Sequence, residues 1–254
     1  LIATADQFGG SREAGVRLVL LNPDGSRAAE WPAIFERRND RPPQVGSTSI
    51  HSLFWLIDGK VLVIGDFTHV SGLARPGIVR LNADGSVDAS FAPALPDDYV
   101  EEAILLPDGR VIVVTANPPW DTTPPRVIIR LNPDGKDDPA FKPVPLSGNG
   151  SVTKIRPDLQ GRILLGGTFG RVGDAERSGL ARLTSDGALA TSFVPLLRFD
   201  PDYGSGVSCI AVQPNGKILI AGGFTNVNGL PRRYVARLNE DGSTDETFEY
   251  RPAT

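Results

Sequence analysis

The sequence has a single cysteine, no methionine and only two histidines among its 254 residues. One cysteine cannot build a disulfide framework, and together with so few histidines it excludes the common Cys and His metal centres. Cys209 stands in the apolar stretch VSCIAV, which predicts that it packs as a small buried hydrophobe.

Long hydrophobic runs and an excess of positive charge are missing as well. No apolar run approaches the roughly 20 residues that cross a bilayer, so membrane insertion is not expected. The net charge is −4 and the arginines are scattered singly, which excludes the basic stripe of a nucleic-acid-binding protein. The opening residues LIATADQFGG lack the pattern of a signal peptide and begin inside an expected strand, so we expect a processed or partial piece of a longer protein.

The motifs of the common enzyme classes are also lacking. There is no nucleophile elbow, phosphate-binding loop or histidine-rich metal set, so we predict no enzyme activity, no metal and no cofactor. Of the two histidines, His51 is expected to pack within a strand and His69 to lie in a variable loop.

What the chain does have is a twelve-residue motif written several times. RLNADGSVDASF returns as RLNPDGKDDPAF, RLTSDGALATSF and RLNEDGSTDETF, and a degraded copy, LLNPDGSRAAEW, comes first. The turn glycines of the five copies lie 50 to 60 residues apart; they are Gly25, Gly85, Gly135, Gly187 and Gly242. A period of this length indicates a repeat architecture.

A second motif alternates with the first in the same steps. It reads LIDGKVLVIGDF, LPDGRVIVVTAN, DLQGRILLGGTF and QPNGKILIAGGF, with turn glycines Gly59, Gly109, Gly161 and Gly216. Each repeat therefore has four short apolar segments, A to D, typified by VSCIAV, KILIAGGF, YVARLN and STDETF. Their Val, Ile, Leu and Thr content and frequent Gly and Pro favour strands. The predicted repeats span 1–45 (partial), 46–96, 97–146, 147–203 and 204–254 of one domain, 1–254.

The turn chemistry of NPDG predicts hairpins between segments A and B and between C and D. Pro presets the first turn position, and Gly supplies the left-handed residue of a bulged hairpin. This turn places an arginine of segment C opposite an aspartate of segment D in three repeats: Arg80 with Asp88, Arg130 with Asp138, and Arg237 with Asp245. A calcium loop is the weaker interpretation of N-x-D-G, because an arginine occupies the position of the first carboxylate ligand.

Segment B is apolar at successive positions, which is typical of a strand buried on both faces. Four-stranded antiparallel units of this kind stack radially as the blades of a β-propeller. We therefore predict an all-β chain with the β-propeller fold, made of five repeats of which the first is incomplete. The alternatives are an arc of a larger propeller and a linear solenoid.

The motifs V-x-x-I, PDGKILIAGGF and RLNPDGSxDxxF together resemble the delta-60 repeat, a bacterial tandem-repeat β-propeller-type domain of unassigned function. The resemblance covers nearly the whole chain. It departs from the pattern in the first repeat, at Leu20, Ala28 and Trp31, and in the third, where Thr115 to Asn117 replace GGF. The resemblance implies a secreted or cell-surface protein, and we expect an extracellular location on this ground.

Binding residues concentrate on loops that a rigid scaffold holds, so the long connections from B to C and from D to A are the predicted binding rim. Aromatic side chains beside carboxylates on this rim suit a sugar face or a protein partner; they are Trp120, Asp121, Tyr203, Asp200, Asp202 and Tyr99. The alternative is that the aromatic residues fill gaps between blades. Asp200 and Asp202 are also weighed as ligands of a hard cation.

These observations leave three functions open. The leading prediction is a non-catalytic extracellular interaction or scaffold module with a protein or glycan partner, which also self-assembles through the incomplete first blade. The second is a lectin-like propeller. The third is a glycoside hydrolase, which needs two carboxylates about 5 to 10 Å apart; Glu101, Glu102 and Asp66 are its candidate acids, but the repeats show no set of three at equivalent depths.

Overall fold

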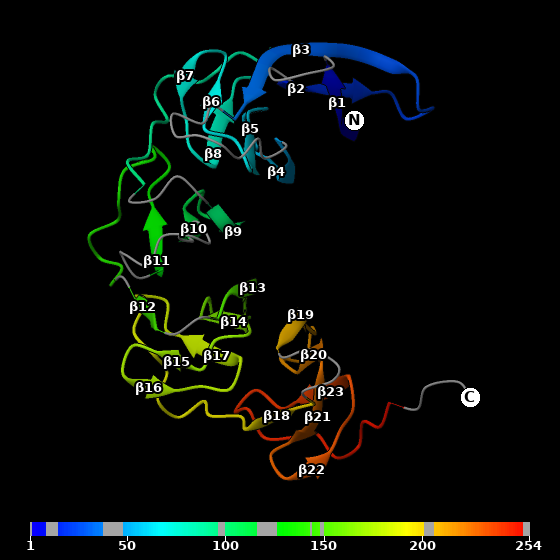
Figure 1. Ribbon diagram of the computed structural model, residues 1–254, viewed down its shortest axis with the longest axis vertical. Coiled ribbons are helices and arrows are strands. Elements are labelled where there is room, and N and C mark those ends of the chain that lie inside the picture. The colour runs from blue at the N-terminus through cyan, green and yellow to red at the C-terminus, as the bar shows by residue number, and fades with distance from the viewer. Residues whose placement is uncertain are drawn as a thin grey trace. The chain divides into compact units, whose positions relative to one another are not determined.

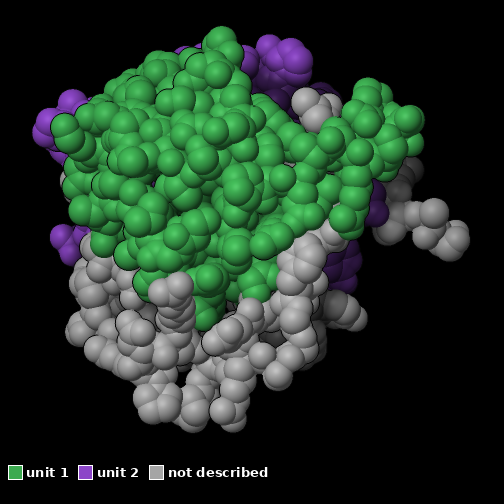
Figure 2. All heavy atoms as spheres, turned by 90° about the horizontal axis from the view of Figure 1, so that it is seen from above, with its two compact units in different colours: residues 1–111, 131–137 green, residues 112–130, 138–254 purple. Residues whose placement is uncertain are grey.

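The computed structural model describes residues 2–8, 15–37, 48–95, 100–115, 126–142, 144–147, 150–200 and 206–250 (Figure 1). Within these residues the chain forms strands and turns, and none of them is helical. Consequently no described segment is a helix of the length and apolar character that a bilayer requires. The chain divides into unit 1, residues 1–111 and 131–137, and unit 2, residues 112–130 and 138–254 (Figure 2).

Three-stranded antiparallel sheets recur along the chain and contain the predicted segments A, B and C. In the second repeat they are β4 (Ile50–Trp55), β5 (Val61–Gly65) and β8 (Ile78–Leu81). The fourth and fifth repeats have β13 (Val152–Pro157), β14 (Ile163–Gly167) and β17 (Leu180–Leu183), and β19 (Val207–Val212), β20 (Ile218–Gly222) and β23 (Val235–Leu238). The central strands β5 and β14 are buried at every residue, as the continuous apolar pattern of segment B predicts.

The third repeat contributes β9 (Val100–Leu105) to unit 1, where it packs near β5. In unit 2, β10 (Val111–Thr115), β11 (Arg126–Leu131), β12 (Val144–Ser147), β15 (Arg171–Val172) and β16 (Ala175–Glu176) follow one another across a sheet. The window DDYVEEAILL, which has the most helix-like composition of the chain, thus contributes a strand.

Segment D forms a single bridge to segment C in place of a fourth strand. Leu81 lies opposite Val87, and the same bridge joins Leu131 to Asp137, Leu183 to Leu189 and Leu238 to Thr244. After the bridge the chain turns: the Phe91 amide donates to the Asp88 carbonyl at 3.2 Å, and the Phe193 amide donates to the Ala190 carbonyl at 3.2 Å in the fourth repeat. In the first repeat β3 (Arg27–Glu36) instead continues for 10 residues.

The connections from B to C, which the sequence predicted to be long rim loops, contain three short hairpins. They are β6 (His69–Val70) with β7 (Leu73–Ala74), β15 with β16, and β21 (Phe224–Val227) with β22 (Leu230–Pro231). Each pairs with a strand that precedes its repeat: β6 with β3, β15 with β12, and β21 with β18 (Leu197–Phe199). These ladders tie consecutive repeats together.

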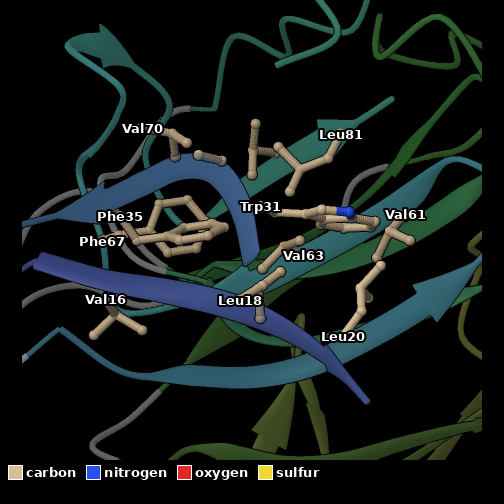
Figure 3. Packing of buried hydrophobic residues seen from close by; sticks show 12 residues of the cluster. Val16, Leu18, Leu20, Trp31, Phe35, Val61, Val63, Phe67, Val70 and Leu81 are labelled. Atoms are coloured by element: carbon tan, nitrogen blue, oxygen red, sulfur yellow. The ribbon is translucent and has the colours of Figure 1, made fainter. Parts of the chain in front are cut away.

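Two strands precede β3. β1 (Ile2–Phe8) pairs antiparallel with β2 (Gly15–Leu21), and β2 pairs with β3, so that the order in this sheet is β1-β2-β3-β6-β7. β2 supplies Val16, Leu18 and Leu20 to the core of unit 1 (Figure 3).

Two aromatic pairs lie in the core of unit 1 or at its edge. Phe35 and Phe67 lie edge to face with their ring centroids 5.1 Å apart, and Figure 3 shows them beside each other. At the edge of the core, the buried Trp31 and the exposed Trp55 are arranged in the same way, with their ring centroids 5.8 Å apart. The core of unit 2 is a separate cluster; among its fully buried members are Phe193, Phe224, Val227, Ala236 and Leu238. Each unit therefore buries its own apolar surface, the main source of stability for sheets with short strands.

One sequence expectation about burial is wrong. Cys209 is exposed, because a register shift between Val207 and Cys209 interrupts the alternation of β19 while Val207 and Ile210 enter the core. The repeat boundaries and the number of blades stay predictions.

Candidate functional site

The repeated arginine and aspartate lie in contact within each repeat. Arg80 Nε donates to Asp88 Oδ2 at 2.8 Å, and Lys60 donates to the same oxygen at 2.8 Å. Burial by itself raises the pKa of the Asp88 carboxyl, but hydrogen bonds from Lys60, Ser90 and Arg80 outweigh that effect and hold the pKa well below its usual range. The carboxylate therefore stays ionised where an unpaired buried acid would take up a proton.

The same ion pair is present in two further repeats. Arg130 Nε donates to Asp138 Oδ2 at 2.7 Å, and Arg237 Nε donates to Asp245 Oδ2 at 2.6 Å. Hydrogen bonds from Lys217, then Thr247 and Arg237, lower the pKa of Asp245. The nine turn glycines named from the sequence have φ values between 72° and 93°, the left-handed region that favours glycine.

The arginine and the last aromatic residue of the motif also contact the next repeat. Arg80 Nη1 donates to the carbonyl of Pro133, in the turn between segments C and D of the third repeat. The Arg80 guanidinium lies 4.7 Å from the centroid of the Phe91 ring, and a Cβ on Gly135 of that turn would approach Phe91 to 3.0 Å. We call this set of contacts, an arginine and an aromatic ring on the turn of the following repeat, the inter-repeat joint.

Two more full joints have the same construction. Arg130 donates to the Ser185 carbonyl, and Arg182 donates to the Glu240 carbonyl at 2.6 Å. The rings that accompany these arginines lie against the glycines of the same turns: Phe141 against Gly187 and Phe193 against Gly242. The first repeat has Trp31 in the place of the phenylalanine, and a Cβ on Gly85 would overlap its ring. The repeated twelve-residue motif thus makes contacts between repeats and also forms a turn within each repeat.

The fourth repeat lacks the aspartate. Ala190 stands at its position, and Arg182 Nε is buried with no hydrogen-bond partner among the described residues. Burial, followed by the charge of Arg162, lowers the pKa of Arg182. Arg182 therefore bonds to the next repeat but has no aspartate to pair with in its own repeat.

A groove of about 440 Å³ lies in unit 2, where the fifth repeat meets the linker that precedes it. Its lining combines hydroxyl, apolar and acidic side chains; the residues are Ser192, Val194, Asn228, Leu230, Asp241, Gly242, Ser243, Thr244 and Glu246. The carboxylates of Asp241 and Glu246 are exposed, and so are Val194 and the nearby Leu196. A hydrogen bond from the Ser243 hydroxyl lowers the pKa of Asp241, which therefore carries its negative charge at neutral pH.

Asn228 links the three segments that line this groove: the linker before the fifth repeat, the β21–β22 hairpin, and the turn between segments C and D. It occupies the turn of the β21–β22 hairpin with φ 52°, and its amide nitrogen donates to the Gly242 carbonyl at 3.0 Å and the Thr244 hydroxyl at 3.1 Å. Its amide oxygen accepts from the Leu196 backbone at 2.8 Å. The Asn-Gly pair at residues 228 and 229 is the typical signal of a two-residue hairpin. This signal could have predicted the β21–β22 hairpin from the sequence.

Most of the binding residues named from the sequence lie outside the described residues; these are Trp120, Asp121, Tyr99, Asp202 and Tyr203. Asp200 is described: it is half-buried after β18, and its backbone amide donates to the Gly223 carbonyl at 3.3 Å. The sugar-binding and cation-binding interpretations of these residues therefore stay predictions. In the described part of the chain, no group of three or more His, Cys, Asp and Glu side chains is arranged to hold a metal ion.

A serine, a histidine and an aspartate meet at the edge of the second repeat. The Ser49 hydroxyl donates to Asp66 Oδ2 at 2.8 Å, and His51 Nε2 lies 3.0 Å from that oxygen and 3.1 Å from the hydroxyl. In a hydrolytic triad the serine and the acid contact opposite nitrogens of the imidazole. Here both contact Nε2, which is not the geometry of a proton relay. His51 is also exposed, so the expectation of a packed side chain is wrong.

The acids weighed for glycoside hydrolysis are placed on two strands or beside them. Glu101 and Glu102 are half-buried on β9, and Asp66 directly follows β5. Asp66 is engaged by Ser49 and His51 as described above.

Three segments of the chain, residues 58–91, 161–193 and 213–248, match the family described as "Domain of unknown function (DUF5122) beta-propeller". Each segment begins in the turn between segments A and B. It ends at the last aromatic residue of the twelve-residue motif, which is Phe91, Phe193 or Phe248. No curated protein matches the chain.

Two solved structures are similar in part. One is a catalytically inactive virginiamycin B lyase from Staphylococcus aureus with quinupristin, at 13% identity and a TM-score of 0.49, over 99% of this chain and 76% of that one. The other is the extracellular domain of a putative one component system from B. thetaiotaomicron, at 11% identity and a TM-score of 0.35, over 84% of this chain and 30% of that one.

The recurring antiparallel sheets and the three matched segments lead to the same class of fold. The segments lie within the second, fourth and fifth repeats, where the sheets are most regular. The chain is an all-β protein of the β-propeller class, and its repeats are similar to those of this family of unknown function.

Proposed function

We propose that the protein is a non-catalytic interaction module and that the groove of the fifth repeat binds an extended protein segment carrying basic and aliphatic side chains. The observation that carries the proposal is the pairing of two exposed carboxylates, Asp241 and Glu246, with the aliphatic Val194 and Leu230 in one groove. Lysine or arginine side chains complement the acids, and aliphatic side chains complement the apolar wall.

The lining of the groove favours a protein partner over a sugar. Sugar faces stack on aromatic rings, and the described lining contains aliphatic side chains in their place. Leu196, which is 61% exposed, extends the apolar surface beside the groove along the linker. Exposed aliphatic side chains rimmed by polar groups are characteristic of protein-binding surfaces.

The scaffold suits this role because the groove is built on fixed elements. Asn228 fastens the hairpin to the C–D turn and to the linker, and the joint between Arg182 and Glu240 fixes the same turn from the preceding repeat. A preformed groove loses little conformational entropy on binding. An extracellular location, which the repeat resemblance supports, belongs to the same proposal and is tested by protease accessibility on intact cells.

A peptide array tests the proposal directly. The protein is applied to arrayed peptides that vary independently in Lys/Arg and in Leu/Val content, and in parallel to a glycan array. We expect retention on peptides that contain both classes of residue and none on sugars. Retention on glycans alone would favour the lectin, and no enrichment among the peptides would overturn the groove.

Two matched variants locate the binding. Asp241→Asn removes a charge from the groove, while Asp84→Asn removes the equivalent charge in the second repeat, where Asp84 bonds Ser86 as Asp241 bonds Ser243. We expect Asp241→Asn to weaken peptide binding several-fold and Asp84→Asn to leave it unchanged. Equal effects of the two variants would exclude the groove as the binding site.

A further inference from the structure

One arginine of the repeated twelve-residue motif has no acid opposite it. Arg182 is 5% exposed, and its Nε has no hydrogen-bond partner among the described residues. Ala190 stands where the second repeat has Asp88. A buried guanidinium nitrogen without a partner is costly, because it gives up its hydrogen bonds to water. The fourth repeat thus contains the cationic half of an ion pair.

Arg182 has the same orientation as the paired arginine of the second repeat. The carbonyl of the arginine accepts from the opposite amide in both repeats, at 2.9 Å from Asp88 and at 2.8 Å from Ala190. Arg80 and Arg182 both donate through Nη1 to a carbonyl of the next turn. Both guanidinium groups also lie against the last phenylalanine of the motif, 4.7 and 4.4 Å from the ring centroid. These shared contacts direct Arg182 Nε toward residue 190, as Arg80 Nε is directed toward Asp88.

The second repeat shows which chemical group this arrangement binds. Asp88 Oδ2 accepts from Arg80 Nε and from Lys60 Nζ, both at 2.8 Å. Asp88 Oδ1 accepts from the amide and the hydroxyl of Ser90, at 3.0 and 2.6 Å. The four donors hold one planar carboxylate. The Asp88 side chain is 7% exposed and that of Lys60 is 29% exposed, so the carboxylate lies just beneath the surface.

An amide and a hydroxyl are placed beside Arg182 in the same way. Ser192 follows Ala190 by two residues, as Ser90 follows its aspartate. Thr191 and Ser192 are exposed and Ala190 is half-buried, so this side of the arginine adjoins solvent. A small anion therefore has a short path to the arginine.

The charges around Arg182 are compatible with an added anion. Arg162 follows the turn between segments A and B, as the lysine of the second repeat does. Its positive charge, after the larger effect of burial, lowers the pKa of Arg182. Arg162 donates to the two nearby acids, Asp158 at 2.6 Å and Glu240 at 2.9 Å, which offsets their repulsion of an anion. An added carboxylate would reduce the repulsion between the two guanidinium groups.

We propose that the fourth repeat binds a small carboxylate anion, of the size of formate or acetate, against Arg182 Nε. One carboxylate oxygen accepts from this nitrogen, and the other accepts from the amide and the hydroxyl of Ser192. Formate has the size of the carboxyl group by which aspartate exceeds alanine. The anion completes the inter-repeat joint of the fourth and fifth repeats, because Arg182 also donates to the Glu240 carbonyl. This site does not depend on the proposed peptide groove.

NMR spectroscopy of the Arg182 Nε–H group tests the site in the intact wild-type chain. Because Nε is buried, its proton exchanges slowly with water and its resonance is observable. An anion of a few atoms binds with a dissociation constant of about 1 mM or weaker, so sodium formate is added to about 200 mM at neutral pH and constant ionic strength. We expect a saturable movement of this resonance. A resonance that does not move, or moves without saturating, would overturn the proposal.

Two variants locate the anion. Ala190→Asp attaches a carboxylate to the chain at the proposed site. We expect its Arg182 Nε–H resonance to lie near the formate-saturated position before any formate is added and to stay there. Thr191→Asp adds the same charge at an exposed neighbour, and we expect it to titrate as the wild type does, within about twofold in affinity, because salt screens exposed charges. Equal titration of wild type and Ala190→Asp would refute the site.

A series of anions distinguishes this site from the general attraction of cations for salt. Formate, acetate and pivalate carry the same charge and the same carboxylate but increase in bulk. We expect the affinity to fall in that order, because the carboxylate must lie just beneath the surface. Equal affinities for the three anions would mean that they associate with exposed charges only, and would contradict the proposal.

Urea unfolding gives an independent measurement. A ligand that binds only the folded chain raises the folding equilibrium constant by about tenfold at ten times its dissociation constant. We expect formate to have this effect on the wild type and little effect on Ala190→Asp, in which the attached carboxylate occupies the site. The same gain in both proteins would be a general effect of salt and would count against the proposal.

Discussion

Arg182 Nη1 donates a hydrogen bond to the carbonyl oxygen of Glu240 at 2.6 Å, across 58 residues of sequence. The bond joins the fourth repeat to the turn of the fifth, and the Phe193 ring lies 4.4 Å from the same guanidinium. Arginine is suited to this task because its planar fork offers several donors in fixed directions. In Arg80 one nitrogen bonds the aspartate of its own repeat, Asp88, while another reaches the next repeat at Pro133.

Restoring the missing aspartate is expected to stabilise the protein. Ala190→Asp gives the buried Arg182 Nε a partner, as Asp88 does for Arg80. We expect the free energy of unfolding to rise by about 1.5–3 kcal/mol, the net value of a charged hydrogen bond. Urea unfolding measures the change. Thr191→Asp adds the same charge at an exposed neighbour, and an equal gain from that control would mean that net charge alone is responsible.

The ion pair of the second repeat predicts a defined pH dependence. Because the folded pKa of Asp88 is lowered, its contribution to stability is complete above the unfolded value of about 3.9 and is lost as the pH falls further. Asp88→Asn is therefore expected to cost about 1–3 kcal/mol near neutral pH and progressively less below about pH 4. Urea midpoints of both proteins across this range give the comparison. A difference that stays constant with pH would show that Asp88 acts through its shape and not its charge.

The contribution of the motif's last phenylalanine to stability should increase with the extent to which the next turn buries its ring. Phe91 is fully buried between Arg80 and Gly135, so Phe91→Ala is expected to cost about 3–5 kcal/mol of unfolding free energy. Phe248 belongs to the same motif position but is half-buried, and Phe248→Ala is expected to cost about 1–2 kcal/mol. Equal losses would contradict the role of the next turn as a cover.

Glycines of the two kinds of turn should respond differently to a methyl group. Gly135→Ala and Gly161→Ala both place alanine at a positive φ, which is 85° and 72° in the two turns. Only the methyl group at 135 also approaches Phe91, at 3.0 Å. We expect Gly135→Ala to cost about 1–3 kcal/mol more than Gly161→Ala, the range of an overpacked contact. Thermal unfolding of the two variants side by side measures the difference. Equal losses of stability would show that the contact between residue 135 and Phe91 does not limit the side chain at that position.

Much of the local structure follows from the sequence because it depends on neighbours in the chain. Asn-Pro-Asp-Gly specifies a turn through the allowed φ values of proline and glycine, and at residues 132–135 that turn places Leu131 opposite Asp137. The apolar run of segment B likewise indicates a strand without a solvent face, and β5 and β14 are buried throughout. These features required no knowledge of distant contacts.

Other features depend on which distant segments come into contact, and local sequence patterns do not indicate those contacts. The bond from Arg80 to Pro133, the ring of Phe91 over Gly135, and the pairing of β6 with β3 join separate repeats. Cys209 is exposed because a bulge shifts the register of β19, although its apolar neighbours indicated burial. The groove around Asn228 arises where a linker, a hairpin and a turn converge.

The sequence by itself therefore determined the repeats, the strands and the turns, since each is set by steric preferences over a few residues. Only the tertiary structure decided what the repeated arginine and phenylalanine do beyond their own turn, because their partners lie about one repeat away. That distance also explains why one motif has two consequences: the turn is formed within a repeat, and the joint requires the next one.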